Sequence, residues 1–428
     1  MEFFGIIDRV RFFINRIRER LWVKPLVISL VSIAAALVAR TADSTDLVKV
    51  VPEVSADSVD TLLSIMAASM LTIAIFAVGA MVAAYSSASN TASPRSFSLV
   101  ISDDISQRAL STFIGAFIFS IVGLVASKNG FFDIAGRFIL FLFTLTMFGI
   151  VVVMFVRWVD RIARLGRLGN TILKVEEATA AAMKHYRDSQ AAKCLPPGSV
   201  KGEGYPLFLD SVGYLQRIDI SRLQSCAENM DGQIRVEVLP GAFVTPDRPL
   251  AYSSADPSSE EGPDEKEIAE AFLVGESRMY DNDPRYGLVV LSQIADRALS
   301  PAVNDPGTAI DIIGILVRLF TMWATPPEEE AEEEVKFDRV EIPELSVQDM
   351  FDDAFIAIAR DGSGSMEVAI RIQKSLSSLA SLGNDSMREA AKHHARRALA
   401  HAEKRLDIPE DLETVRQLAG FATSDSGS

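Results

Sequence analysis

Long apolar runs are concentrated before about residue 156, and four of them approach the roughly 20 residues that a helix needs to cross a bilayer. They lie at about 22–39, 62–84, 110–126 and 138–156. The first is the weakest, because Lys24 and Pro25 stand at its start. No small-residue cleavage site follows this run and Arg40 ends it, so we interpret it as a retained anchor and not as a signal peptide. The pattern predicts a transmembrane domain over 21–156.

Basic residues flank the first and last of these runs, whereas the loop between the first two is acidic. The flanks contain Arg9, Arg11, Arg16, Arg18, Arg20 and Lys24 on one side and Arg157, Arg161, Arg164 and Arg167 on the other. The positive-inside rule then places both termini in the cytoplasm. We expect a multi-pass protein of a bacterial inner membrane, with the lipid bilayer as its first partner.

Residues 1–20 alternate apolar side chains with arginines at helical spacing. The pattern favours an amphipathic helix on the cytoplasmic leaflet over a plain basic flank that only fixes topology.

The four spans carry small and hydroxylated residues but no ionisable residue deep inside. Buried charges mark proton relays and ion sites in membranes, so their absence argues against a proton-coupled pump. The small residues are Ser64, Ser69, Thr72, Gly79, Gly115, Ser120, Gly123, Thr144 and Thr146. They are typical of close helix packing, which we favour, and they could also line a pore.

An apolar stripe continues beyond the fourth run, where Ile162, Leu165, Leu168, Ile172 and Val175 recur every three or four residues. This predicts one unbroken helix from the fourth span to about Ala192. Its part within 157–195 is expected to project from the membrane into the cytosol. The stripe must pack on the rest of the chain or on a neighbouring subunit.

Residues 196–252 change to strand-like pieces with Gly and Pro at turns. Val212–Ile220 and Gln233–Leu239 are typical of strands, and a short helix near Arg222–Asn229 separates them. They predict a small β-barrel-like module.

The segment 253–428 is mostly helical in its periodicity. Helices are expected near 267–277, 284–299, 306–323, 347–360, 365–382, 386–406 and 409–421, with acidic loops at 253–266 and 326–334. Asp283-Pro284 and Asp305-Pro306 each place a capping acceptor before a proline at the first helical position. Ser346 and Asp385 are further candidate caps, and Gly383 a helix end. The expected fold class is mainly α, with a four-helix transmembrane domain and a cytoplasmic α+β domain that holds a helical bundle.

The net charge of −15 makes a nucleic-acid partner unexpected, because phosphate binding needs a basic surface. The two cysteines, Cys194 and Cys226, fall in the part placed in the cytosol and are expected as reduced thiols. His393, His394 and His401 share one expected helix. A solvated helix explains them better than a metal site.

The densest group of polar residues lies in GESRMYDNDPRYGLVVLSQIADRALSPAVNDPGTAIDII, Gly275–Ile313. The run RALSPAVNDPGTA and the upstream DNDPRYGL resemble the signature of the domain-of-unknown-function-2254 family of predicted bacterial membrane proteins. The pieces GYLQRID and PGAFV and the order of four spans are similar as well, over most of residues 10–325. The resemblance implies a membrane protein and no particular activity.

The same stretch is the candidate ligand-binding site, formed by Arg278, Asp281, Asp283, Arg285, Arg297, Asn304, Asp305, Thr308 and Asp311. Helix capping and Arg–Asp pairing explain most of these residues. The alternative is a polar site at a helix N-terminus that receives an anion or a small polar ligand.

No nucleophile elbow, Walker loop, GxGxxG, HExxH or EF-hand occurs, so the sequence predicts no enzyme class, no cofactor and no metal site. The favoured hypothesis is a homo-oligomeric channel or transport-related protein with a cytoplasmic regulatory domain. The alternatives are a membrane-anchored enzyme or ligand-binding protein that uses 278–311, and a scaffold that recruits partners.

Overall fold

The computed structural model describes residues 23–44, 51–96, 98–99, 104–165, 167–188, 193–200, 204–256, 265–325 and 335–423. Two compact units divide the chain between Thr171 and Ile172. We call them the membrane unit and the C-terminal unit. The interfacial helix predicted for 1–20 and the acidic segments 257–264 and 326–334 lie outside the described residues.

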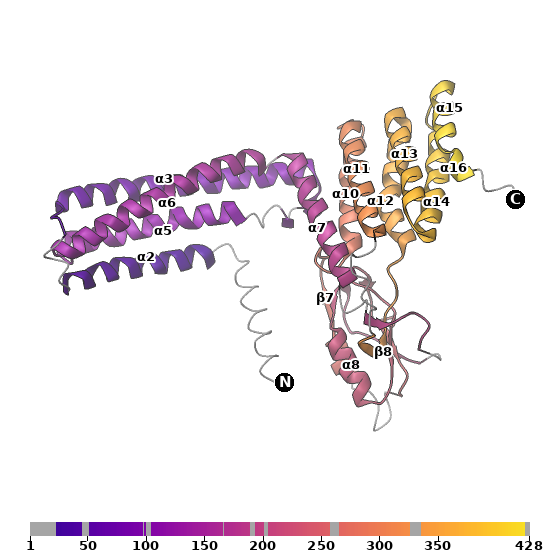
Figure 1. Cartoon of the computed structure of the whole chain (residues 1–428), viewed down its shortest axis with the longest axis horizontal. Helices are drawn as coiled ribbons and strands as arrows, with labels where there is room; N and C mark the ends of the chain where they lie inside the picture. The colour runs from indigo at the N-terminus through magenta and orange to yellow at the C-terminus, as the bar shows by residue number, and fades with distance from the viewer. Residues whose placement is uncertain are drawn as a thin grey trace. The chain divides into compact units, whose positions relative to one another are not determined.

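Four long helices run side by side in the membrane unit (Figure 1). They are α2 (Val23–Thr41), α3 (Ala56–Thr91), α5 (Asp104–Lys128) and α6 (Ile134–Leu165), and the short helices η1 (Ala42–Ser44) and η3 (Pro94–Ser96) follow α2 and α3. Each long helix contains one of the four predicted runs. The α3 helix has 36 residues and is therefore about 54 Å long, well beyond the roughly 30 Å hydrocarbon core.

Aromatic and aliphatic side chains fill the centre of the membrane unit. Phe113, Phe119, Leu63 and Leu140 are buried, whereas leucine, isoleucine and valine side chains on α2, α3 and α6 are exposed. A helix bundle with an apolar interior and an apolar exterior suits a lipid environment.

By length and composition, four helices within the described residues could cross a membrane: Ala56–Ser87, Ile105–Lys128, Ile134–Ala163 and Pro306–Ala324. The first three coincide with the second, third and fourth predicted spans, and they are long and apolar enough for that role. The last is α11 of the C-terminal unit. It buries Ile312, Leu316 and Phe320 there, so its hydropathy is that of a core helix. That α2 also spans the membrane stays a prediction.

The predicted unbroken helix from the fourth span to Ala192 is wrong. Helix α6 ends at Leu165, Arg167 is not helical, and a separate helix α7 runs over Leu168–Asp188. The segment RLGRLGN contains two glycines, and glycine costs roughly 1 kcal/mol relative to alanine inside a helix. Glycine therefore favours a helix end here, although the apolar periodicity continues through it.

The stripe on α7 packs on the chain's own C-terminal unit. Val175 and Met183 are fully buried, and Thr179 lies so close to Gly287 that a Cβ at position 287 would overlap the Thr179 hydroxyl. On the same helix, Glu176 forms a bidentate ion pair with Arg318 at 2.8 and 2.9 Å. The sequence left open what the apolar stripe packs against. For the part of the stripe on α7, it is the C-terminal unit of the same chain.

Two open sheets form the β part of the C-terminal unit. The five-stranded sheet has the order β1 (Cys194–Leu195), β8 (Phe337–Glu341), β4 (Ile234–Val236), β6 (Ala251–Ser253) and β2 (Tyr205–Leu207). The three-stranded sheet has the order β5 (Phe243–Val244), β3 (Gly213–Ile218) and β7 (Phe272–Gly275). Helices α8 (Ile220–Asn229) and α9 (Glu265–Ala269) accompany them. The described strands close no barrel, so the barrel-like detail is not confirmed.

Helices α10 to α15 form a two-layer stack of three helical hairpins (Figure 1). One layer contains α10 (Pro284–Leu299), α12 (Val347–Asp361) and α14 (Asp385–Ala402), and the other α11 (Pro306–Ala324), α13 (Met366–Leu382) and α15 (Pro409–Leu418). The short helices η5 (Gly362–Gly364) and α16 (Gly420–Thr423) complete the stack. Because β8 stands between the first two hairpins, the hairpins have no fixed sequence period.

Most of the predicted helix ends are correct. Asp283, Asp305 and Ser346 are the N-caps of α10, α11 and α12, and Gly383 ends α13. Asn384 and not Asp385 caps α14. The helix predicted at 267–277 is wrong, because its second half is strand β7, where Phe272 packs into the core of the sheets.

Candidate functional site

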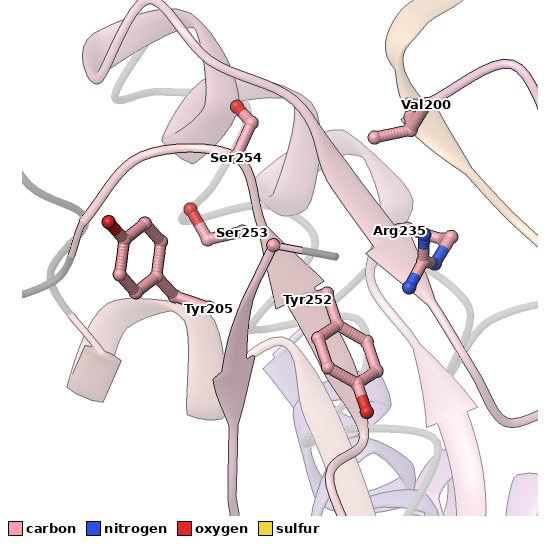
Figure 2. Close-up of a pocket in the computed structure, with 7 residues that line it drawn as sticks. Val200, Tyr205, Arg235, Tyr252, Ser253 and Ser254 are labelled. Carbon is pink, nitrogen blue, oxygen red and sulfur yellow. The ribbon is translucent and has the colours of Figure 1, made fainter. Parts of the chain in front are cut away.

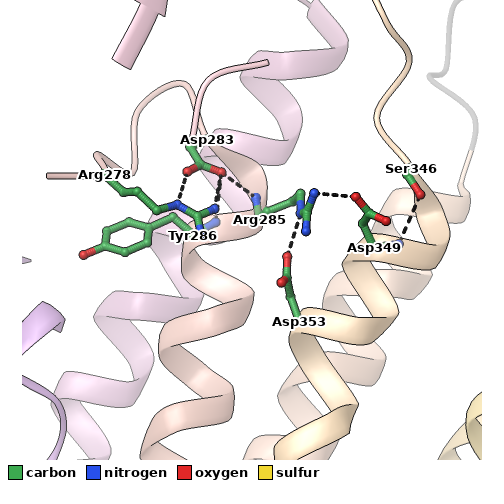
Figure 3. Close-up of polar contacts among 7 residues, drawn as sticks. All are labelled: Arg278, Asp283, Arg285, Tyr286, Ser346, Asp349 and Asp353. Atoms are coloured by element: carbon green, nitrogen blue, oxygen red, sulfur yellow. Dashed lines mark hydrogen bonds and ion pairs between the residues drawn. The ribbon is translucent and has the colours of Figure 1, made fainter. Parts of the chain in front are cut away.

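Asp283 is the most connected of the predicted site residues, and it lies almost completely buried at the start of α10 (Figure 3). Its carboxylate accepts the backbone N–H groups of Arg285 and Tyr286, both at 3.1 Å. It also receives two bonds from the Arg278 guanidinium, at 2.7 and 3.0 Å. One buried carboxylate thus caps a helix and neutralises a cation, and its lone pairs are used within the chain.

Three of the sequence motifs meet around Asp283. Gly241 of PGAFV has a φ of +95°, and a Cβ there would overlap the Asp283 carboxylate. The Gln216 side chain of GYLQRID donates to Ser277 O at 2.8 Å, and Asn282 donates back to Gln216 O at 3.3 Å. The motifs therefore form the joint between the three-stranded sheet and the helical stack.

Aromatic rings cover the same joint. The Arg278 guanidinium lies 5.2 Å from the centre of the Tyr286 ring, and the rings of Tyr280 and Tyr286 lie 4.7 Å apart. Both tyrosines are buried, so the ion pair of Arg278 and Asp283 is shielded from water on this side.

Arg285 continues the network to α12 (Figure 3). It contacts Asp349 and Asp353, each at 2.6 Å. Burial raises the pKa of Asp353, and the bond from Arg285 opposes that rise. Burial lowers the pKa of Arg285, but its bonds to the two aspartates outweigh this, so the pKa lies above its usual value. Sequence reasoning missed Asp349 and Asp353, since nothing local to α12 shows that they face α10.

The remaining predicted site residues lie at the opposite end of α10. Arg297 is twelve positions after Arg285, which is about 18 Å along the helix axis. There Asp305 accepts the Thr308 N–H at 3.1 Å and the Thr308 hydroxyl at 2.6 Å. These bonds, with the hydroxyl first, lower the pKa of Asp305. Asn304 takes the left-handed conformation with φ of +50°.

Seven of the nine predicted residues therefore form two groups and not one site. Arg278, Asp283 and Arg285 belong to the first group, and Arg297, Asn304, Asp305 and Thr308 to the second. Asp281 and Asp311 are exposed. In both groups the observed bonds are caps and ion pairs within the chain.

A small cavity of about 290 Å³ lies on the five-stranded sheet, away from the predicted residues (Figure 2). Its lining comprises Val200, Gly204, Tyr205, Arg235, Tyr252, Ser253 and Ser254. Arg235 lies 4.9 Å from the Tyr252 ring centre and bonds Glu237 at 2.8 Å. Ser254 accepts the Gln233 N–H at 2.7 Å. No sequence motif indicated this cavity, because its residues come from separate strands.

Glu341 fixes one wall of the cavity. Its buried carboxylate accepts the N–H groups of Gly198 and Val200, at 2.8 and 2.6 Å. A loop that carries Pro196, Pro197 and Gly198 is thereby attached to the end of β8.

The expectation that the histidines share a solvated helix face is wrong for His394. It is buried against Phe351 and Phe355 and lies 3.1 Å from Asp352. Burial lowers the pKa of His394 to about 4, although Asp352 opposes the shift. His393 is exposed, as expected. Within the described residues, no three His, Cys, Asp or Glu side chains are grouped to hold a metal ion.

Both cysteines are free thiols in buried positions. Burial raises the pKa of Cys194 to about 12, so its thiolate is scarce at neutral pH.

The apolar helices of the membrane unit and the motifs at the Asp283 joint indicate a class of membrane protein. The family described as predicted membrane protein (DUF2254) matches residues 18–378, and the chain belongs to it. This confirms the resemblance found in the sequence. The family description names no activity.

Curated relatives are similar over a shorter stretch. Uncharacterised proteins of Mycobacterium bovis and Mycobacterium tuberculosis are 29% identical over 120 residues, which are 27% of this chain and 23% of each relative. The match thus spans less than a quarter of their length. No solved structure matches.

Proposed function

We propose that this chain is a membrane-anchored binding protein, in which the membrane unit is the anchor and the hairpin stack of the C-terminal unit holds partners. The observation that carries the proposal is the way in which the membrane unit satisfies its hydroxyl groups. Ser120, Thr144 and Thr146 donate to Ala116 O, Leu140 O and Leu142 O of their own helices, at 2.7 to 2.9 Å.

Gly115 and Gly123 serve packing inside the membrane unit, whereas Ser64, Ser69, Thr72 and Gly79 lie on the exposed side of α3. A Cβ at Gly115 would overlap Ile28 of α2, and one at Gly123 would contact Leu63 and Leu140. Phe113 and Phe119 are buried between the described helices, and aromatic rings at these places favour close packing over a path for an ion or a solute.

The C-terminal unit supports the second half of the proposal. Stacked helical hairpins expose long helix faces, which other proteins of this kind use to bind partners. We further propose that the protein lies in a bacterial inner membrane with both termini in the cytoplasm, as the arginine-rich flanks of the spans indicate.

A channel or transport function between copies is the second candidate. Two observations favour it. Exposed apolar side chains such as Ile75 and Phe76 on α3 and Phe148 and Val153 on α6 could pack against other copies, and α7 links the last span directly to the C-terminal unit. Homo-oligomerisation is part of this candidate.

Flux through liposomes that contain the purified full chain distinguishes the two candidates. An anchor gives ion and dye flux equal to that of protein-free liposomes. Flux that falls in Thr72→Val and Thr144→Val, but not in a matched Val152→Ala variant, would overturn the anchor proposal and support conduction.

Binding is tested separately, with a photo-crosslinking residue at Ser378 on the exposed face of α13 in living cells. A defined partner band that is absent with the crosslinker at lipid-facing Phe76 supports a binding unit. The same bands from both positions would contradict it.

A further inference from the structure

The exposed face of α14 differs in charge from the rest of this acidic chain. Residues 388–405 contain six Lys or Arg and two Asp or Glu, whereas the whole chain has 42 and 57. Helix α14 itself holds four of these six cations, and two of them, Arg388 and Lys392, pair with Asp385 and Glu389 of the same helix. The excess of cations therefore lies at Arg396, Arg397, Lys404 and Arg405, in a protein with a net charge of −15.

The fold places these cations together. Met387, Ala391, His394, Ala395 and Ala398 face the core, so the opposite side of α14 meets solvent. His393, Arg396, Arg397 and Ala400 are exposed there, and Lys404 follows in the turn after the helix. Side chains three or four positions apart are neighbours on a helix, so Arg397 and Ala400 lie on the same side of α14, and the exposed Lys404 follows within the next turn of chain.

Two of these cations have no acidic partner within the described residues. Arg397 and Lys404 form no ion pair there, whereas Arg285 on α10 binds Asp349 and Asp353. Arg396 uses its guanidinium to hold Ala422 O at 2.9 Å, and therefore serves the fold. Arg397 and Lys404 therefore neutralise no carboxylate of the described residues. In a chain with an excess of carboxylates, such cations are not required for packing or solubility.

We infer that the basic face of α14, centred on Arg397 and Lys404, binds the anionic headgroups of the bilayer that holds the membrane unit. Charge complementarity supports this occupant, because an anionic leaflet attracts each Lys or Arg that lies near its surface. Because α6 and α7 join the two units covalently, binding of this face to the same bilayer would be intramolecular, and a weak patch would suffice.

The test uses the full chain in nanodiscs whose lipid is either neutral or partly anionic. A fluorophore is attached to Ala400→Cys, and a quencher to the lipid headgroups. Both native cysteines are buried, so the new cysteine is labelled selectively. Ser378→Cys on the exposed face of α13 is the matched control label.

We expect quenching of the label at position 400 in anionic nanodiscs, little quenching in neutral ones, and little at position 378 in either. Arg397→Glu with Lys404→Glu should reduce the quenched fraction at least tenfold, because the attraction becomes repulsion. The matched pair Arg371→Glu and Lys374→Glu, also exposed but on α13, should leave it unchanged. Raising the salt concentration should weaken quenching in the parent protein.

Quenching at position 400 that is independent of lipid charge, or that survives the reversal of Arg397 and Lys404, would overturn the inference, and so would its absence from anionic nanodiscs. A thermal unfolding transition like that of the parent protein shows that the charge-reversed chain still folds. None of these results depends on whether the chain conducts ions or binds a protein partner.

Discussion

The membrane unit and the C-terminal unit place their polar side chains under different constraints. In the membrane unit, hydroxyls such as those of Thr144 and Ser120 bond the carbonyl one turn back in the same helix. In the C-terminal unit, polar side chains connect elements far apart in sequence, as Arg285 connects α10 to α12. Substitutions of these hydroxyl residues inside the spans should therefore have local effects, and substitutions of such ion pairs in the C-terminal unit long-range effects. At the end of the spans the membrane unit also has a long-range contact, because Asp43 accepts the N–H groups of Asp133 and Gly136.

The largest expected effect is that of Asp283→Ala. It leaves Arg278 without its buried partner and removes the cap of α10, so we expect a loss of about 3–5 kcal/mol in the free energy of unfolding. Trp323 fluorescence in a background with Trp22→Phe and Trp158→Phe reports on the C-terminal unit. Asp283→Asn, which keeps an acceptor oxygen, should lose less. A loss below about 0.5 kcal/mol for Ala, as for an ordinary surface site, would contradict the joint described here.

A pH dependence follows from His394. Its folded-state pKa of about 4 lies below the ordinary value of 6.5, so the unfolded chain binds the proton more readily. Neutral His394 therefore makes its full contribution to the free energy of unfolding above pH 6.5. About 2–3 kcal/mol of that free energy is lost as the pH falls toward 4. Unfolding by denaturant at several pH values measures this. His394→Phe should flatten the curve in that window, and an unchanged curve would refute the assignment.

The docking of α7 predicts a smaller effect. Gly287→Ala adds a methyl group where the Thr179 hydroxyl lies, and we expect a loss of about 1–3 kcal/mol from overpacking. Adding Thr179→Ala should recover much of this loss, so that the double variant loses less free energy of unfolding than the sum of the two single variants. This difference is the coupling energy of a double-mutant cycle. Additive effects of the two substitutions would show that α7 does not pack on α10 in this way.

The smallest effect belongs to the membrane unit. Thr144→Val removes a hydroxyl whose only observed partner is Leu140 O on the same helix. The helix keeps its backbone bonds, so we expect a change of at most about 1 kcal/mol. Trp158 fluorescence in detergent, with Trp22→Phe and Trp323→Phe, measures it. A loss as large as that of Asp283→Ala would indicate that Thr144 contacts a neighbouring helix. It would contradict the local bonding of hydroxyl groups described for the membrane unit.

The sequence predicts those parts of the fold that rest on local signals. Apolar run length located α3, α5 and α6, and Asp-Pro pairs located the starts of α10 and α11. Local sequence signals fail where a contact with a distant segment decides the secondary structure. Strand β7 exists because β3 is available to pair with it, although the local pattern favours a helix.

The candidate site shows the same limit. Asp283 and Arg278 are five positions apart, so their pairing is open to sequence reasoning. Asp349 and Asp353 are more than sixty positions from Arg285, and only the packing of α12 on α10 brings them close. The burial of His394 also depends on α12, which supplies Phe351 and Phe355 around its ring.

Strand β8 lies between β1 and β4, although the chain reaches it only after α10 and α11. A ribosome that has made the other strands of this sheet has therefore not yet supplied its central member. During synthesis β1 and β4 therefore stay unjoined until α10 and α11 have been made. A fragment cut before β8 lacks the strand that joins the two parts of this sheet.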